Sequence, residues 1–171
     1  MQRRGSCKDG CGTTYYPRSQ KIAYIGDCTY ESRYVGYYQT LLTHHIPFDY
    51  RHVHPSSQTE EEGARIMNDI LKEEDPPTAI FCANDCTAGV LRSLNKCRRK
   101  NYLPSVIAID NIRKSAKTSP MLTTIDIPKQ ELAHFALLLL LDQQKKAHKE
   151  CVRIELPCRL IERESCTYAP C

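Results

Sequence analysis

The sequence lacks both a long hydrophobic segment and the glycine-rich loops of the common nucleotide-binding folds. Its longest uncharged, mostly apolar run spans ten residues, 132–141, whereas a transmembrane helix needs roughly 20. The basic N-terminus is not followed by the apolar stretch of a secretory signal, so we predict a cytoplasmic protein without a membrane segment. Neither Gly-x-Gly-x-x-Gly nor Gly-x-x-x-x-Gly-Lys-Ser/Thr occurs, which excludes the standard dinucleotide-binding and P-loop sites.

Cysteine is plentiful, but its spacing is not that of a zinc site. The closest pairs, Cys7 with Cys11 and Cys82 with Cys86, are separated by three residues, whereas zinc ribbons and fingers repeat a two-residue spacing. Disulfide frameworks belong to short secreted chains, so we expect reduced thiols here. No nucleophile, base or metal-ligand set stands out, and we therefore expect no enzyme, no metal and no cofactor.

The positive charge is concentrated at the N-terminus. The formal net charge of the 171 residues is +4, and residues 1–21 alone carry +4, so residues 22–171 sum to zero. Binding to nucleic-acid phosphates needs a concentrated basic surface. The body of the chain is therefore not expected to bind DNA.

Strand and helix patterns alternate along most of the chain. Residues 1–20 form an irregular leader with no hydrophobic period, residues 21–166 form one domain, and 167–171 are a tail. The alternation predicts an α/β fold, a doubly wound and mainly parallel sheet with helices on both faces. The expected strands cover 21–26, 49–54, 78–83, 105–109, 121–125, 152–155 and 159–162, and the expected helices cover 31–44, 59–72, 87–97 and 128–146.

The second of these helices has a clear start signal. Thr59 is followed three residues later by Glu62, the spacing of a capping box. In that motif each side chain accepts a hydrogen bond from an otherwise unpaired backbone N–H at the helix start.

Polar residues follow the strands at the points where a ligand is expected. In an open parallel sheet the ligand lies beyond the carboxyl ends of the strands. A guanidinium can bind two adjacent hydroxyls, and carboxylate and amide oxygens accept hydrogen bonds from hydroxyl groups. Arg33, Asn84 and Asp110 together therefore suit a polyol or sugar. Weaker candidates beside them are Asp27, Asp85 and Asn111.

Each candidate also has a purely structural interpretation. Asn84 or Asp85 can cap the helix that follows them, and a capping residue can also contact a ligand. Arg33 can pair with Glu31 or Asp27 at the surface. Position along the chain alone leaves both interpretations open.

Motifs spread over the domain resemble the effector domain of lactose-repressor (LacI/GalR) family transcription regulators. They occur in the family's order and read KIAYIG at 21–26, SRYVGY at 32–37, PTAIFCAND at 77–85, VIAIDN at 106–111, SPMLTT at 119–124 and LPCRLIERES at 156–165. The resemblance implies the C-terminal part of a periplasmic-binding-protein-like fold: one lobe, plus a crossover helix at 128–146 that enters the other lobe. It also implies that Arg33, Asn84 and Asp110 face the effector.

The resemblance implies a sugar-sensing domain of a repressor. Operator DNA would be bound only through an N-terminal helix-turn-helix segment absent from this fragment, and residues 1–20 do not match the family. The alternative is the sugar-binding protein of a transport system, which has the same two-lobed fold. A homodimer is also implied, with Thr87, Leu91, Leu94 and Met121 at the interface; helix-spaced leucines at 91 and 94 can instead belong to the core.

The helix at 128–146 is apolar on every side, as is typical of a buried helix. Without the other lobe, we expect this helix to expose an apolar patch and the chain to self-associate.

Overall fold

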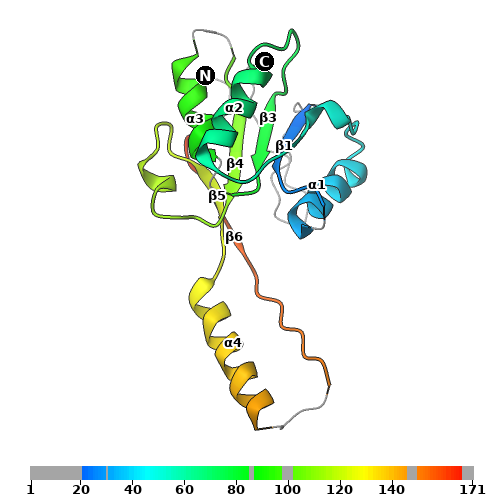
Figure 1. Ribbon diagram of the computed structural model, residues 1–171, viewed down its shortest axis with the longest axis vertical. Coiled ribbons are helices and arrows are strands. Elements are labelled where there is room, and N and C mark those ends of the chain that lie inside the picture. The colour runs from blue at the N-terminus through cyan, green and yellow to red at the C-terminus, as the bar shows by residue number, and fades with distance from the viewer. Residues whose placement is uncertain (1–20, 30, 85–86, 98–101, 146–149, 167–171) are drawn as a thin grey trace, which may run out of the picture.

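The computed structural model describes residues 21–29, 31–84, 87–97, 102–145 and 150–166. The predicted leader at 1–20 and the predicted tail at 167–171 lie outside the described residues. Within them, strands and helices alternate along one sheet, from which a single long helix projects (Figure 1).

A six-stranded sheet organises the chain, in the order β2-β1-β3-β4-β5-β6. The first five strands in this order pair in parallel, and β6 pairs antiparallel with β5. The α/β prediction of a mainly parallel sheet is therefore confirmed. The strands are β1 (Ile22–Gly26), β2 (Val53–Pro55), β3 (Ala79–Cys82), β4 (Ser105–Ile109), β5 (Thr123–Asp126) and β6 (Arg159–Ile161), and the helices are α1 (Ser32–Thr43), α2 (Glu60–Ile70), α3 (Thr87–Lys96) and α4 (Lys129–Gln144).

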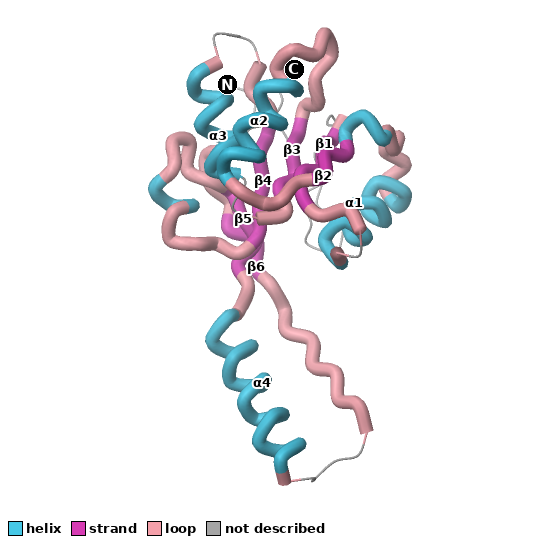
Figure 2. The backbone as a smooth tube through the Cα atoms, viewed as in Figure 1, coloured by secondary structure: helices cyan, strands magenta, loops and turns pink. Residues whose placement is uncertain are grey.

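Helices cover both faces of this sheet, as Figure 2 shows. On one face, α2 and α3 pack over β1, β3 and β4, and their contact is built around Met67, Ile70 and Val90, which are fully buried. On the other face, α1 brings Tyr37 and Leu41 against the buried ring of Tyr24. Apolar side chains on both sides of the central strands explain why these strands are continuous hydrophobic runs in the sequence.

The cap of α2 is half of what its sequence motif predicts. The Thr59 hydroxyl accepts a hydrogen bond from the Glu62 backbone N–H at 3.2 Å, so the predicted helix start is confirmed. The Glu62 carboxylate instead accepts from Arg65, at 2.7 Å. A salt bridge one turn along the helix therefore takes the place of the second capping bond.

Two strand predictions need correction. The strand predicted over 152–155 is wrong: this segment forms no ladder with any described strand, and its Val152 and Ile154 stay about half exposed. The strand predicted over 49–54 begins later, because Tyr50–His52 form a short 3-10 helix capped by the Asp49 carboxylate. Apolar alternation alone cannot supply the neighbouring strand that a ladder requires.

Edge strand β2 carries a histidine that burial keeps neutral. His54 Nε2 is buried and has no hydrogen-bond partner in the described chain. Burial lowers the pKa of His54 below its usual 6.5, and nearby His52 and Arg65 lower it further, while Asp69 acts in the opposite direction. Protonating this ring in the folded state is therefore costly.

We expect the chain to lose stability as the pH falls through 6.5. The unfolded state then binds a proton that folded His54 does not, so unfolding becomes easier toward acid pH and stability is full above pH 6.5. Urea unfolding between about pH 5.5 and 8 measures this slope, which the H54Q variant is expected to reduce. The matched control is H134Q on the exposed surface of α4; an equal slope in wild type and H54Q would contradict the assignment.

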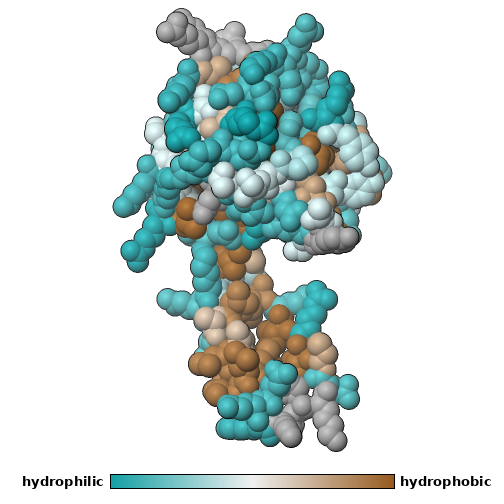
Figure 3. Space-filling model, in the orientation of Figure 1, coloured by the Kyte–Doolittle hydropathy of each residue, from teal (hydrophilic) through white to brown (hydrophobic). Residues whose placement is uncertain are grey.

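Helix α4 lies apart from the sheet and its covering helices (Figure 1). None of its 16 residues is buried. No helix within the described residues is long and apolar enough to cross a membrane. Most residues of α4 are nevertheless hydrophobic, and Figure 3 shows apolar side chains gathered on the projecting part of the molecule.

Candidate functional site

The order of the strands places a topological switch between β1 and β3. From β1 the chain first adds β2 on one side, and then crosses to β3 on the other. Ligands of open α/β sheets bind beyond the carboxyl ends of strands at such a point. Asp27, Asn84 and Asp110 follow the ends of β1, β3 and β4, so all three belong to this edge.

Two of the predicted residues meet there. The Arg33 Nη2 atom, in the first turn of α1, lies 3.6 Å from Asp110 Oδ1 after β4. The same guanidinium donates through Nη1 to Glu31 Oε1 at 2.6 Å. Arg33 therefore makes the surface pair with Glu31 and also contacts Asp110 of the predicted site.

A buried tyrosine on β1 contacts the Glu31 carboxylate. The Tyr24 hydroxyl, on β1, lies 3.0 Å from the Asp27 carbonyl oxygen and 3.2 Å from Glu31 Oε2, two acceptors that share its single proton. Burial raises the pKa of Tyr24 well above its usual value of 10, and the Glu31 charge raises it further. The hydroxyl therefore stays protonated and available as a donor at neutral pH.

The backbone after β4 adopts an uncommon conformation at the site. Asp110 and Asn111 have φ values of 88° and 43°, in the left-handed region where Asp and Asn are the best tolerated residues other than glycine. Lys129 donates to the Asp110 carbonyl oxygen. This turn places the Asp110 carboxylate beside Arg33.

Asn111, a weaker candidate for ligand contact, is used inside the protein. Its amide nitrogen donates to Asp126 Oδ1 at 2.9 Å, and its amide oxygen accepts from Arg163 Nη2 at 2.8 Å. Arg163 also donates to the Leu122 carbonyl at 2.7 Å. Since both polar atoms of this amide are occupied, Asn111 supports the turn and is not part of the site that we propose.

Sequence reasoning missed the role of Ser165. Its hydroxyl donates to the Val106 carbonyl at 2.6 Å and accepts from the Thr123 N–H at 2.8 Å, so it joins β4 to β5. Ser165 is buried. The motif at 156–165 was visible in the sequence, but only the fold shows that its end anchors the strands from which the Asp110 turn emerges.

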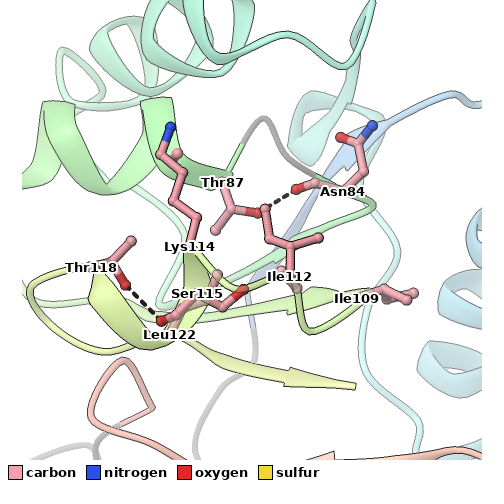
Figure 4. Close-up of a pocket in the computed structure, with 10 residues that line it drawn as sticks. Asn84, Thr87, Ile109, Ile112, Lys114, Ser115, Thr118 and Leu122 are labelled. Carbon is pink, nitrogen blue, oxygen red and sulfur yellow. Dashed lines mark hydrogen bonds between the residues drawn. The ribbon is translucent and has the colours of Figure 1, made fainter. Parts of the chain in front are cut away.

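Asn84 lies at the same edge, beside a small pocket. Its amide donates to Gln58 Oε1, and its backbone carbonyl accepts from Thr87 at the start of α3. Figure 4 shows the Asn84 side chain directed away from the apolar wall formed by Ile109 and Ile112.

The remaining weaker candidates are Asp27 and Asp85. Asp27 is exposed, and its carboxylate accepts from the backbone and hydroxyl of Thr29. These bonds lower the pKa of Asp27. Asp85 lies outside the described residues.

The residues expected at a dimer interface fall into two groups. Thr87 and Leu91 are only 2% and 3% exposed, because this side of α3 packs on the sheet and α2. Leu91 and, in part, Leu94 pack in the hydrophobic core, as the core alternative for these leucines predicts, while the dimer contact itself stays a prediction. Met121 is 38% exposed and stays a predicted contact.

One arginine, several carboxylates and one amide lie at or near the carboxyl ends of the strands at this edge. Groups of these kinds can hydrogen-bond to hydroxyl groups. Among the described residues, no group of three His, Cys, Asp or Glu side chains could hold a metal ion. Free thiols are present at Cys28, Cys151, Cys158 and Cys166.

A family comparison agrees with this fold. A periplasmic binding protein-like domain matches residues 18–166. The chain belongs to this family. The resemblance to the C-terminal part of a lactose-repressor-type effector domain is likewise confirmed by relatives and structures of that kind.

Curated relatives of this family member are repressors by name. The chain is 34% identical over 140 residues to the HTH-type transcriptional repressor PurR of Photorhabdus laumondii. It is 35% identical over 142 residues to the HTH-type transcriptional repressor CytR of Escherichia coli. Each match covers 81% of this chain and 41% of the relative, so the chain spans about two fifths of their length.

Solved structures show the same architecture. A LacI family regulator from Enterococcus faecium with bound ribose matches 88% of this chain and 58% of its own, with 28% identity and a TM-score of 0.76. The complex of the transcriptional regulator CelR with cellobiose matches 86% of this chain and 47% of its own, with 25% identity and a TM-score of 0.77.

Proposed function

We propose that this chain is the effector-sensing part of a LacI-type transcriptional repressor and that it binds a sugar or a similar small polar ligand at the Arg33, Asn84 and Asp110 edge. The observation that carries the proposal is the pairing of Arg33 with Asp110 at 3.6 Å, across the switch point of the sheet. A charged pair in that position orients donors and acceptors toward a ligand. The Arg33–Asp110 pair lies in one lobe of the two-lobed fold, so it supplies part of the proposed effector site.

Two similar proteins support the ligand class. The E. faecium regulator is seen with ribose and CelR with cellobiose, both uncharged polyols. The side chains at this edge are those that bind hydroxyl groups. A polyol is therefore the ligand class that the site fits best.

The relatives favour a repressor over the alternative of a transport protein, because both named relatives are HTH-type repressors. They also favour a binding role over catalysis. A repressor works beside DNA, so the predicted cytoplasmic location follows from the same proposal. Operator binding through an N-terminal helix-turn-helix segment and homodimer formation are parts of it, and Met121 is the exposed residue that we assign to the dimer contact.

The direct test is nuclear magnetic resonance of the isotopically labelled chain during titration with ribose and cellobiose. We expect shifts in the Arg33 side-chain signal and in the backbone signals of Asn84 and Asp110, at millimolar sugar because one lobe offers part of a site. The D110N variant should lose these shifts, since an amide nitrogen replaces a carboxylate acceptor. The matched control is D75N, whose carboxylate also pairs with a cation, Lys21, at the opposite edge of the sheet.

In the complete regulator, D110A is expected to abolish the response to effector while operator binding persists. An electrophoretic mobility shift assay with and without the inducing sugar measures both properties. An unchanged induction curve in this variant, or sugar-induced shifts confined to residues far from Arg33, would contradict the assigned site.

A further inference from the structure

The positive charge of Arg33 is already matched by two carboxylates. Its guanidinium contacts Glu31 at 2.6 Å and Asp110 at 3.6 Å. The three side chains are 27%, 19% and 24% exposed, so water screens them only in part. Interactions between partly buried charges are stronger than those between exposed ones.

Glu31 occupies a place that would otherwise attract an anion. It is the residue before the first turn of α1, and it makes no side-chain capping bond to that helix. The N-terminus of a helix carries partial positive charge and unpaired N–H groups, and it commonly binds phosphate or carboxylate groups. Arg33 in the first turn would strengthen such a site, but its Nη1 atom already donates to the Glu31 carboxylate.

The position of Glu31 is set by the core. Tyr24 is fully buried on β1, and its hydroxyl lies 3.2 Å from Glu31 Oε2, while Arg33 holds Oε1. Arg33 therefore donates to Oε1, and Oε2 shares the Tyr24 proton with the Asp27 carbonyl oxygen. A carboxylate held at both oxygens is costly for a ligand to displace.

Carboxylates outnumber cations among the charged residues at this edge of the sheet. Three carboxylates, those of Asp27, Glu31 and Asp110, belong to this edge, against the cations of Arg33 and of Lys129, which reaches the Asp110 carbonyl. An anionic ligand there would face like charges. An uncharged ligand faces none, because its hydroxyls can donate to the carboxylates and accept from the guanidinium N–H groups that remain.

We propose that Glu31 is a specificity-determining residue that makes the effector site accept uncharged polyols and reject phosphorylated or otherwise anionic ones. The inference rests on the proposed function for the location of the effector, and it adds the class of effector and the residue that selects it. Glu31 acts by neutralising Arg33, which lies in the first turn of α1. Selectivity of this kind works against the wrong ligand through repulsion.

The experiment uses inorganic phosphate as the anionic probe and ribose as the neutral probe, at constant ionic strength. The Arg33 side-chain signal of the labelled chain is followed for wild type, E31Q and a control, E62Q. Glu62 makes a comparable pair with Arg65 at 2.7 Å in the first turn of α2. We expect E31Q to bind phosphate at Arg33 at least about tenfold more tightly than wild type, and E62Q to behave as wild type at Arg33.

A second variant tests how Glu31 is held. Y24F removes the hydroxyl that lies beside Oε2, so phosphate affinity at Arg33 should fall between those of wild type and E31Q. Thermal unfolding of each variant shows that it is folded before titration.

Equal phosphate affinity of wild type and E31Q at Arg33 overturns the proposal, whether both bind or neither does. The ribose titration reports separately on the proposed function. If E31Q gains phosphate binding but wild type shows no response to ribose, the polyol site is contradicted. Charge selection by Glu31 would still be supported in that case.

Discussion

The G89A variant is expected to lose about 3 kcal/mol of stability, near the upper end of the usual cost of overpacking. Gly89 is buried on α3 where this helix crosses α2. A Cβ atom at this position would overlap the Glu60 carbonyl oxygen and lie 2.8 Å from the Ala64 backbone nitrogen. Both obstacles are backbone atoms of α2, so no side-chain rotation relieves them and the two helices would have to separate.

Equilibrium unfolding in urea measures this loss, and G36A on α1 is the matched control. Gly36 is exposed, and an added Cβ there meets nothing within 4 Å. Alanine favours helix over glycine by about 1 kcal/mol, so G36A should be neutral or stabilising. If G89A unfolded at the same urea concentration as wild type, the close contact of α2 and α3 would be wrong.

Several regular elements of this chain follow from local sequence. Strand β4 occupies the predicted residues 105–109, because a buried apolar run ends there at Asp110. The start of α2 follows from Thr59, whose hydroxyl needs only a backbone N–H three residues away. Such signals act over one or two turns of chain and so can be read directly.

The site depends on contacts that local sequence does not contain. The sequence predicts that Arg33 and Asp110 lie at one edge of the sheet, but not that they pair, and it indicates Glu31 only as a surface partner of Arg33. Its contact with Tyr24 joins side chains on different elements. The partners of Asn111, a weaker ligand candidate, are Asp126 and Arg163, which become its neighbours only when the sheet forms.

The isolated chain is expected to self-associate through α4. Five leucines of this helix, Leu132, Leu137, Leu138, Leu140 and Leu141, are between 44% and 63% exposed. They are spread around the helix, and Figure 3 shows the apolar surface to which they belong. Burying one half-exposed leucine is worth roughly 1 kcal/mol, so several together can offset the cost of association.

Static light scattering should give a mass above 19.6 kDa that rises with concentration, accompanied by binding of an apolar dye. Replacing Leu137, Leu140 and Leu141 with glutamine should restore the monomer and remove dye binding, since glutamine keeps helix propensity but not the apolar surface. The control is L103Q, which changes a leucine that is 83% exposed and outside α4. A monodisperse monomer that binds no dye would contradict the prediction. Association that persists in the triple variant would instead assign the contact to another surface, such as the one around Met121.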